Sequence, residues 1–367
     1  MTWKYHNPVR IVFADAFDET IGAIADGKKE GLLMCSNRFR ETDDFKKISH
    51  SLPDFQCFSA IENNPSFDSC GKAIDFARNF KPQMIVAIGG GSVIDTAKAV
   101  RMAIYKSCYE IRELVGCQVE AKEKPLFVAV PTTHGAGSEL TMWATVWDKL
   151  EKKKYSLSES ANYPDYAVYD PNLTSSLPLA ASVSSTLDAL SHSLEAVWNK
   201  NANPVSSNFA AKAVALIVGN LEKLVEPISI ETRSDLLMAS MYAGLAFSNT
   251  KTAAAHSISY PLTAYFGIPH GIACSMPLNS LFRLNTARMQ DIWPGFLGKA
   301  RLDDFDELWE KVSGLANTGI PFSLSRYGVE RGDLDWLADL AFSKGRMENN
   351  IVDLNRSDVS RILADIY

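Results

Sequence analysis

The sequence predicts an N-terminal α/β domain, built on a parallel sheet with helices on both faces, followed by an all-α C-terminal domain. Up to about residue 178, short β-branched runs alternate with helical patterns, as expected when helices connect parallel strands. Beyond that point the strand patterns cease and apolar residues recur at helical spacing. Because 367 residues exceed one ordinary core, we expect two domains, residues 1–177 and 178–367.

The elements of the first domain follow from local patterns. Residues 66–80 have helical spacing, and residues 144–160 alternate around a charged turn, which predicts a hairpin before residues 165–171. Five runs rich in β-branched or apolar residues are expected to be strands, namely residues 10–16, 31–36, 55–60, 84–90 and 125–131. The hairpin should close this domain.

Composition excludes several classes of partner. The chain is 46% hydrophobic and 22% charged, with a formal net charge of -6, so it lacks the basic excess that nucleic acid or an anionic membrane requires. No run approaches the roughly 20 apolar residues that cross a bilayer, and no signal peptide is evident. The six cysteines form no CxxC pair and lie mostly in apolar runs, typical of reduced cytoplasmic thiols. We expect a cytoplasmic homo-oligomer, a dimer, acting on a small molecule.

A glycine-rich loop joins a predicted strand to a helix in residues 84–100. Gly89, Gly90, Gly91 and Ser92 would let a ligand approach the backbone, and the helix N-terminus favours a pyrophosphate. The alternative is a tight turn without a ligand. Asp95 and Lys98, one turn further along, could lie near a cofactor or form only a surface pair.

Small hydroxyl residues follow the next strand. Thr132, Thr133 and Ser138, with the glycines between them, suit hydrogen bonding to a ribose or nicotinamide, although they could equally serve the turns of their own loop. Two such loops after successive strands favour a dinucleotide, because ligands of open α/β sheets gather at the carboxyl ends of strands.

Four residues of the second domain form a candidate metal site. Asp188 and His192 are four apart in a helical segment and share one face. His256 and His270 lie among apolar and small residues, where a polar side chain needs a partner. One such histidine is more often a hydrogen-bonded core residue, but three with an aspartate suit Fe(II) or Zn(II).

These segments resemble the iron-containing, or group III, alcohol dehydrogenases along nearly the whole chain. The matching motifs are GGGSVIDTAK, PTTHGAGSE, DALSHSLE and AAAHSISYPLTAYFGIPHG, in the order of that family. The resemblance implies a dinucleotide-binding first domain, a metal- and substrate-binding second domain, and Asp188, His192, His256 and His270 as metal ligands. The implied cofactor contacts are Gly89, Gly90, Gly91, Ser92, Asp95, Thr132, Thr133, Ser138, Thr141 and Lys154.

The chain departs from the family pattern at three places. Tyr260 replaces a histidine that is a candidate proton relay, so proton delivery could use Tyr260, water or the cofactor ribose. Ala136 replaces a threonine, which could remove one cofactor hydrogen bond. After the second strand, Ser36 takes the place of an acidic residue and is followed by Arg38 and Arg40, which favours NADPH over NADH.

Within the family the chain looks most like the phosphonoacetaldehyde reductase, or hydroxyethylphosphonate dehydrogenase, group. Residues 144–160, residues 198–210 and Tyr260 carry this likeness. It implies reduction of phosphonoacetaldehyde to 2-hydroxyethylphosphonate, with the metal as Lewis acid and the nicotinamide as hydride donor. Substrate contacts are expected from Trp143, Phe247 and Lys251, which could instead be two core residues and a solvated helix end.

Three other functions compete with this interpretation. The protein could be a generic short-chain alcohol dehydrogenase or aldehyde reductase. A dehydroquinate synthase-like lyase would share the two-domain architecture and the cofactors, but the helical half lacks the many basic residues that its oxygenated substrate requires. A non-catalytic nucleotide sensor would not need four intact ligand positions.

Overall fold

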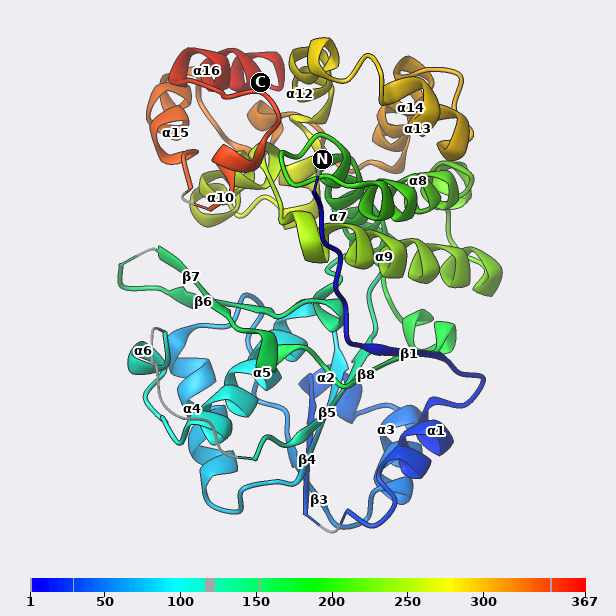
Figure 1. Cartoon of the computed structure of the whole chain (residues 1–367), viewed down its shortest axis with the longest axis vertical. Helices are drawn as coiled ribbons and strands as arrows, with labels where there is room; N and C mark the ends of the chain where they lie inside the picture. The colour runs from blue at the N-terminus through cyan, green and yellow to red at the C-terminus, as the bar shows by residue number, and fades with distance from the viewer. Residues whose placement is uncertain (1, 29, 116–122, 152, 344) are drawn as a thin grey trace. The chain divides into compact units, whose positions relative to one another are not determined.

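The computed structural model describes residues 2–28, 30–115, 123–151, 153–343 and 345–367. The chain forms two compact units (Figure 1). The sheet unit consists of Pro8–Thr133 and Ser138–Thr174, and the helical unit consists of Met1–Asn7, His134–Gly137 and Ser175–Tyr367. Two short segments, Met1–Asn7 and His134–Gly137, thus group with the helical unit although they precede its main part in the sequence.

The sheet unit is built on a six-stranded parallel sheet with the strand order β1-β8-β5-β4-β2-β3. The strands are β1 Arg10–Phe13, β2 Gly31–Cys35, β3 Phe55–Phe58, β4 Met84–Gly89, β5 Leu126–Pro131 and β8 Tyr166–Tyr169. The predicted fold class is confirmed. β8 was not among the five expected strands, because its four residues are too few for an alternating pattern to be evident.

Helices cover both faces of this sheet, because successive residues of the central strands point to opposite sides. Leu32 and Ile85 belong to a core that includes residues of α4 and α5, whereas Leu33 and Val86 belong to a core that includes residues of α1 and α3. β2 and β4 are buried along their whole length, as central parallel strands are. The helices of this unit are α1 Phe17–Ile24, α2 Asn37–Arg40, α3 Asp43–Ser51, α4 Phe67–Arg78, α5 Gly91–Lys106 and α6 Ile111–Leu114.

The expected hairpin is present as β6 Trp143–Asp148 and β7 Lys153–Ser158, which pair antiparallel. Residues that alternate along β6 are buried, and Ala144 and Val146 join the core beside α4 and α5. The hairpin therefore closes that side of the sheet unit.

The helical unit is arranged around α7, which packs against α8, α9, α10 and α11. α7 is buried along most of its length, so polar side chains on its faces lie inside the unit. The helices are α7 Leu179–Val197, α8 Pro204–Val218, α9 Ile230–Thr250, α10 Ala254–Phe266, α11 His270–Ser275, α12 Leu278–Asn285, α13 Trp293–Ala300, α14 Phe305–Gly314, α15 Leu334–Leu340 and α16 Arg356–Asp365. Among the described residues, no helix combines the length and the apolar character needed to cross a bilayer.

Candidate metal centre

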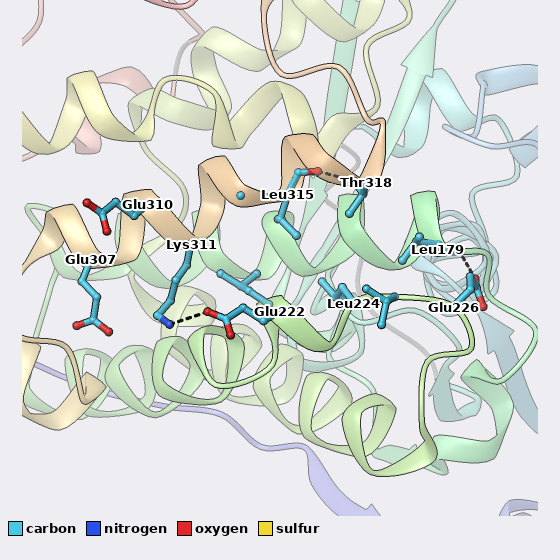
Figure 2. Close-up of a pocket in the computed structure, with 12 residues that line it drawn as sticks. Leu179, Glu222, Leu224, Glu226, Glu307, Glu310, Lys311, Leu315 and Thr318 are labelled. Carbon is cyan, nitrogen blue, oxygen red and sulfur yellow. Dashed lines mark hydrogen bonds and ion pairs between the residues drawn. The ribbon is translucent and has the colours of Figure 1, made fainter.

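The helical unit contains a pocket of about 590 Å³ that does not coincide with any predicted site residue (Figure 2). It is lined by Leu179, Leu221, Glu222, Leu224, Val225, Glu226, Glu307, Glu310, Lys311, Gly314, Leu315 and Thr318. Four carboxylates and one ammonium group surround an apolar floor, and Lys311 Nζ already pairs with Glu222 Oε1 at 3.1 Å. This negative rim would repel an anionic substrate.

The predicted metal ligands meet elsewhere in this unit, around one carboxylate oxygen. The Nε2 atoms of His192, His256 and His270 lie 4.0, 3.4 and 3.9 Å from Asp188 Oδ1. Atoms bound about 2.0–2.3 Å from a tetrahedral ion lie about 3.3–3.8 Å from one another. The His256 distance falls within this range, and the His192 and His270 distances exceed it by 0.1–0.2 Å. Small shifts of those two imidazoles would therefore bring all four side chains, drawn from α7, α10 and α11, within reach of a single cation.

Two glycines allow the backbone to approach α7 closely enough to build this cluster. A Cβ atom on Gly271, next to His270, would lie 1.7 Å from the carbonyl oxygen of Ser184, and one on Gly135 would lie 2.4 Å from that of Ser185. Neither contact is possible for a larger residue. The Gly135 carbonyl in turn accepts a hydrogen bond from His192 Nδ1 at 3.2 Å, which orients that imidazole.

Glu195, which the sequence analysis missed, orients His256. It lies seven residues after Asp188 on α7, is completely buried, and accepts a hydrogen bond from His256 Nδ1 at 2.6 Å. Its carboxylate also accepts backbone N–H groups of Ala253, Ala255 and His256 at the start of α10. A metal-binding histidine usually donates its second ring nitrogen in this way. An acidic residue on the buried face of a helix is the signal that could have revealed it.

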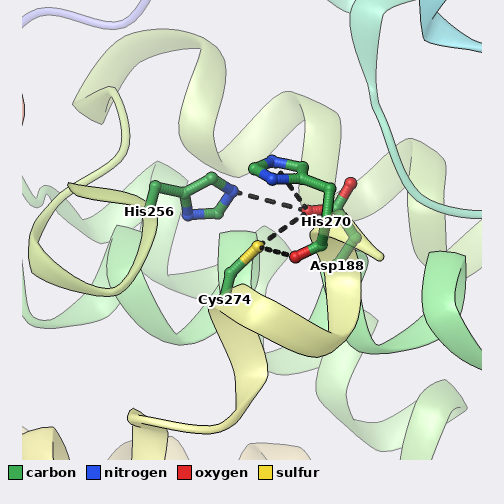
Figure 3. A group of neighbouring side chains, drawn as sticks. All are labelled: Asp188, His256, His270 and Cys274. Carbon is green, nitrogen blue, oxygen red and sulfur yellow. Dashed lines mark hydrogen bonds and ion pairs between the residues drawn. The ribbon is translucent and has the colours of Figure 1, made fainter. Parts of the chain in front are cut away.

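Cys274 is a second residue that the sequence analysis did not include. It lies one turn after His270 on α11, and its Sγ is 3.6 Å from Asp188 Oδ1 and 2.8 Å from the His270 carbonyl oxygen. Asp188, His256, His270 and Cys274 each offer a ligand atom, and all four atoms lie within 4.8 Å of one another (Figure 3).

The charges of the cluster are tightly linked. Burial opposes ionisation of Asp188, but the three surrounding histidines outweigh it and hold the pKa of its carboxyl well below the usual range. Burial lowers the pKa of His192 to about 4, so this imidazole is neutral at neutral pH. Burial also lowers the pKa of His256, but the neighbouring Cys274, Glu195 and Asp188 outweigh burial and raise this pKa well above its usual value.

The cluster fits a divalent metal ion on the chemistry of its donors. His192 and His256 each use Nδ1 in a hydrogen bond, which directs Nε2 toward Asp188. His256 Nε2 is buried and has no hydrogen-bond partner within the described part of the chain. Such an orphaned nitrogen beside a carboxylate and two further imidazoles is a costly arrangement unless a cation joins them.

The glycine loop in the sheet unit has the geometry of a helix N-terminus open to a ligand. β4 ends at Gly89, α5 begins at Gly91, and no side chain caps the helix at Gly90. Ser92 Oγ accepts a hydrogen bond from the Asn64 backbone, and Thr133 lies against Gly90, where an added Cβ would meet its side chain at 3.2 Å. The uncapped N–H groups of a 16-residue helix favour an anion.

Lys98 is buried, which excludes the surface-pair alternative for Asp95 and Lys98. Its Nζ donates to the Ser138 and Trp143 carbonyl oxygens and to the Ser138 and Thr141 hydroxyls, at 2.6–3.2 Å. Asp95 accepts from the Ser138 hydroxyl and, at 2.8 Å, from the Thr145 backbone. Asp95, Ser138 and Thr141 therefore tie α5 to residues 138–145, and their predicted contact with a cofactor stays a prediction.

The remaining predicted cofactor residues lie in three other parts of the sheet unit. Ser36 caps α2 by accepting the Phe39 N–H at 3.2 Å, with Arg38 and Arg40 exposed on that helix. Lys154 lies on β7 with its Nζ 5.7 Å from the centre of the Trp147 ring. Thr132 follows β5, and its N–H bonds to the Gly89 carbonyl at 3.1 Å.

Comparison with known proteins identifies the family. A family model described as iron-containing alcohol dehydrogenase matches residues 8–171, and a model of the C-terminal part of the same family matches residues 182–367. The chain belongs to the iron-containing alcohol dehydrogenase family. The family prediction is thus confirmed, and membership implies a metal and a nicotinamide cofactor for an oxidoreductase of the alcohol dehydrogenase type.

Relatives in this family carry several activities. An aldehyde-alcohol dehydrogenase of Streptococcus pneumoniae is 30% identical over 288 residues, 75% of this chain but 32% of that protein, so this chain spans about a third of its length. A 1,3-propanediol dehydrogenase of Klebsiella pneumoniae is 28% identical and is matched over 93% of this chain and 92% of its own. The structure of sulfoacetaldehyde reductase from Bifidobacterium kashiwanohense in complex with NAD+ has a TM-score of 0.90 at 25% identity, covering 100% and 99% of the two chains.

The predicted catalytic and substrate residues differ in how deeply they are buried and in whether they contact the metal cluster. Phe247 is buried and stacks on His192 at 4.0 Å between ring centres. Tyr260 lies parallel to His270 at 6.5 Å, and burial raises the pKa of its phenol to about 12, so its oxygen keeps its proton at neutral pH. Trp143 begins β6 and is half-buried, while Lys251 is exposed at the end of α9.

Arg346 provides a positive charge near the cluster that the sequence analysis missed. Its guanidinium lies over the Tyr260 ring, 4.8 Å from the ring centre, on the chain segment before the short turn at Met347–Asn349. His134, by contrast, is completely buried, and neither ring nitrogen has a partner within the described residues. Burial, reinforced by Arg233, lowers the pKa of His134 to about 3, so it is a neutral group and not a cation for a substrate.

Proposed function

We propose that this protein is a metal-dependent, nicotinamide-linked oxidoreductase that reduces a short aldehyde to a primary alcohol. The observation that carries this proposal is the group of three imidazole nitrogens 3.4–4.0 Å from Asp188 Oδ1 in a chain of the iron-containing alcohol dehydrogenase family. Asp188, His192, His256 and His270 would hold a divalent metal, Fe(II) or Zn(II), which when bound would polarise a substrate carbonyl as a Lewis acid.

The residues of the chain position the reactants. Glu195 and the Gly135 carbonyl fix two imidazoles with Nε2 toward the metal position. Phe247 covers one face of His192 and excludes water from it. Tyr260 holds a proton on its oxygen beside His270, where it can donate a hydrogen bond to a substrate oxygen. The uncapped N-terminus of α5 would hold the pyrophosphate of a nicotinamide dinucleotide, which when bound would supply the hydride.

NADPH is the proposed cofactor. After β2 the chain has the hydroxyl of Ser36 and the exposed guanidinium groups of Arg38 and Arg40, a combination that accepts a 2′-phosphate. The test is kcat/KM for NADPH and NADH. Ser36→Asp should move the preference toward NADH by about tenfold, which is about 1.4 kcal/mol. An unaltered enzyme that prefers NADH tenfold would contradict the proposal.

The proposed substrate is a short aldehyde with an anionic group, with phosphonoacetaldehyde the leading candidate and 2-hydroxyethylphosphonate its product. A structural relative is named for sulfoacetaldehyde, a short aldehyde with a sulfonate group. Arg346, held over Tyr260, and Lys251 supply positive charge in the helical unit. A phosphonate or sulfonate binds more strongly to a guanidinium than to an ammonium group, because two N–H groups of the guanidinium can donate to two of its oxygens at once.

The deciding experiment measures NADPH oxidation with phosphonoacetaldehyde, sulfoacetaldehyde and propanal. We expect the two anionic aldehydes to exceed propanal in kcat/KM, and the advantage to shrink as salt is raised. Arg346→Ala should abolish the advantage and leave the rate with propanal unchanged. The matched control is Arg361→Ala, which removes an exposed arginine paired with Asp358.

A generic aldehyde reductase is the second candidate, favoured by the likeness to a 1,3-propanediol dehydrogenase over nearly the whole of both chains. Equal kcat/KM for propanal and phosphonoacetaldehyde at low salt would support it and contradict the anionic substrate. We place either reaction in the cytoplasm, because the five cysteines that the structure describes are free thiols, and in a homodimer.

A further inference from the structure

We propose that Cys274 is an additional ligand of the metal, so that the site offers one thiolate together with the carboxylate and the three imidazoles. This inference rests on the metal site of the proposed function, and it concerns a residue outside the four ligands that the family motifs indicate. It predicts a sulfur–metal bond in the loaded protein.

The position of the sulfur supports this assignment. Cys274 Sγ is 3.6 Å from Asp188 Oδ1, which falls between the distances of His256 Nε2 and His270 Nε2 to the same oxygen, 3.4 and 3.9 Å. Figure 3 shows Cys274, His256 and His270 gathered around Asp188, with dashed lines that join each of the three to its carboxylate. A sulfur that belonged only to the packing of α11 would not need to lie among the donor atoms.

The helix geometry explains how one short element contributes two ligands. His270 is the first residue of α11 and Cys274 is four residues later, so both side chains lie on one face about one turn apart. The helix is held against α7 by the contact of Gly271 with Ser184, which brings this face to Asp188. The same i, i+4 spacing places Asp188 and His192 on α7.

The competing role of the thiol is to donate hydrogen bonds, to the Asp188 carboxylate and to a carbonyl oxygen of its own helix. Its Sγ lies 2.8 Å from the His270 carbonyl oxygen, a contact that a buried cysteine makes without any metal. On metal binding the S–H bond breaks, the proton leaves to solvent, and the sulfur electron pair forms the bond to the metal, with no change of oxidation state. The two roles therefore differ in whether a sulfur–metal bond exists.

A thiolate ligand changes the choice of metal. Soft sulfur ligands favour Zn(II) and Co(II) over hard cations such as Mn(II) and Mg(II), whereas a site of one carboxylate and three imidazoles discriminates less. We expect Cys274→Ser to lower the preference for Zn(II) over Mn(II) by at least about tenfold. Removal of a residue that only contacts a metal ligand already lowers metal affinity by about 10–100-fold, and loss of a ligand should cost no less.

The test uses the full-length protein loaded with Co(II). Visible d–d bands report that the metal is bound, and a near-ultraviolet band reports charge transfer from sulfur to Co(II). We expect both bands in the unaltered protein, and only the visible bands in Cys274→Ser. Cys70→Ser, which changes a buried thiol of α4 in the sheet unit, is the matched control and should keep both bands.

The outcomes separate this inference from the proposed function. Visible bands without a charge-transfer band in the unaltered protein would overturn the role of Cys274 and leave the metal site in place. Failure to bind Co(II) or Zn(II) at all would overturn both. Because the spectrum of the unaltered protein decides the question, the result does not depend on whether Cys274→Ser folds, and Cys274→Ala provides a second variant.

Discussion

The molecule contains two clusters of buried charged residues, and they differ in how completely the chain satisfies them. In the sheet unit, the Lys98 ammonium donates to four oxygens and Asp95 accepts two hydrogen bonds. In the helical unit, donor atoms of three histidines and a cysteine surround Asp188, and His256 Nε2 has no hydrogen-bond partner within the described residues. A satisfied cluster stabilises the fold, whereas an unsatisfied one indicates a ligand.

Breaking the satisfied cluster should have the largest effect, and the effect should be on stability. Lys98→Met leaves the Ser138 and Trp143 carbonyl oxygens without their donor and removes the positive charge that acts on Asp95. Removal of one member of a buried ionic group costs about 3–5 kcal/mol. Urea unfolding at neutral pH measures the change. Lys72→Met, which removes an exposed ion pair with Asp68, is the control and should change stability by less than about 1 kcal/mol. Equal effects of the two variants would show that the Lys98 network is not stabilising.

Breaking the unsatisfied cluster should remove the metal and leave the fold intact. Asp188→Asn replaces the anion at its centre with a neutral amide, so metal affinity should fall by more than about 100-fold, or about 2.7 kcal/mol. Competition with a chromophoric chelator measures the affinity, and circular dichroism checks the fold. The control is Asp339→Asn at the exposed pair with Arg356. A variant that binds metal as tightly as the unaltered protein would disprove the ligand assignment.

A smaller effect should follow from Glu195, which acts on the metal only through His256. Glu195→Gln keeps an oxygen for the backbone N–H groups of α10 but loses the charge that orients the imidazole, so metal affinity should fall by about 10–100-fold. The same competition assay applies, with the exposed Glu310→Gln as control. Metal affinity unaffected by Glu195→Gln would mean that Glu195 serves only the start of α10.

Metal binding at the Asp188 cluster should depend on pH, which sets this cluster further apart from the satisfied cluster around Lys98. Cys274, Glu195 and Asp188 raise the pKa of His256, so the metal-free site holds a proton that a metal must displace. Affinity should therefore rise with pH below that pKa, by up to about tenfold per unit for each proton displaced. Zn(II) titrations from about pH 6 to about pH 8, at constant ionic strength, measure this slope. A flat profile would show that neither His256 nor Cys274 releases a proton when the metal binds.

Much of the candidate site could be predicted from sequence because its parts are local. Asp188 and His192 share a face through the four-residue spacing of α7, and Gly89 to Ser92 follow a strand and start a helix. Glu195 and Cys274 follow the same helical periodicity, because Glu195 lies seven residues after Asp188 on α7 and Cys274 lies four residues after His270 on α11. The sequence alone nevertheless did not single them out. An acidic residue or a cysteine on a buried helix face has many explanations until its neighbours are known.

The sequence by itself determined the fold class, the family and the four ligand candidates, because strand and helix periodicity and ordered motifs are properties of neighbouring residues. Only the tertiary structure decided that Lys98 is buried and satisfied by residues 138–143, and that α7, α10 and α11 converge on Asp188 Oδ1. Such contacts join residues 40 to 86 positions apart. They depend on how helices pack, where glycines such as Gly271 permit close approach, and no local pattern encodes them.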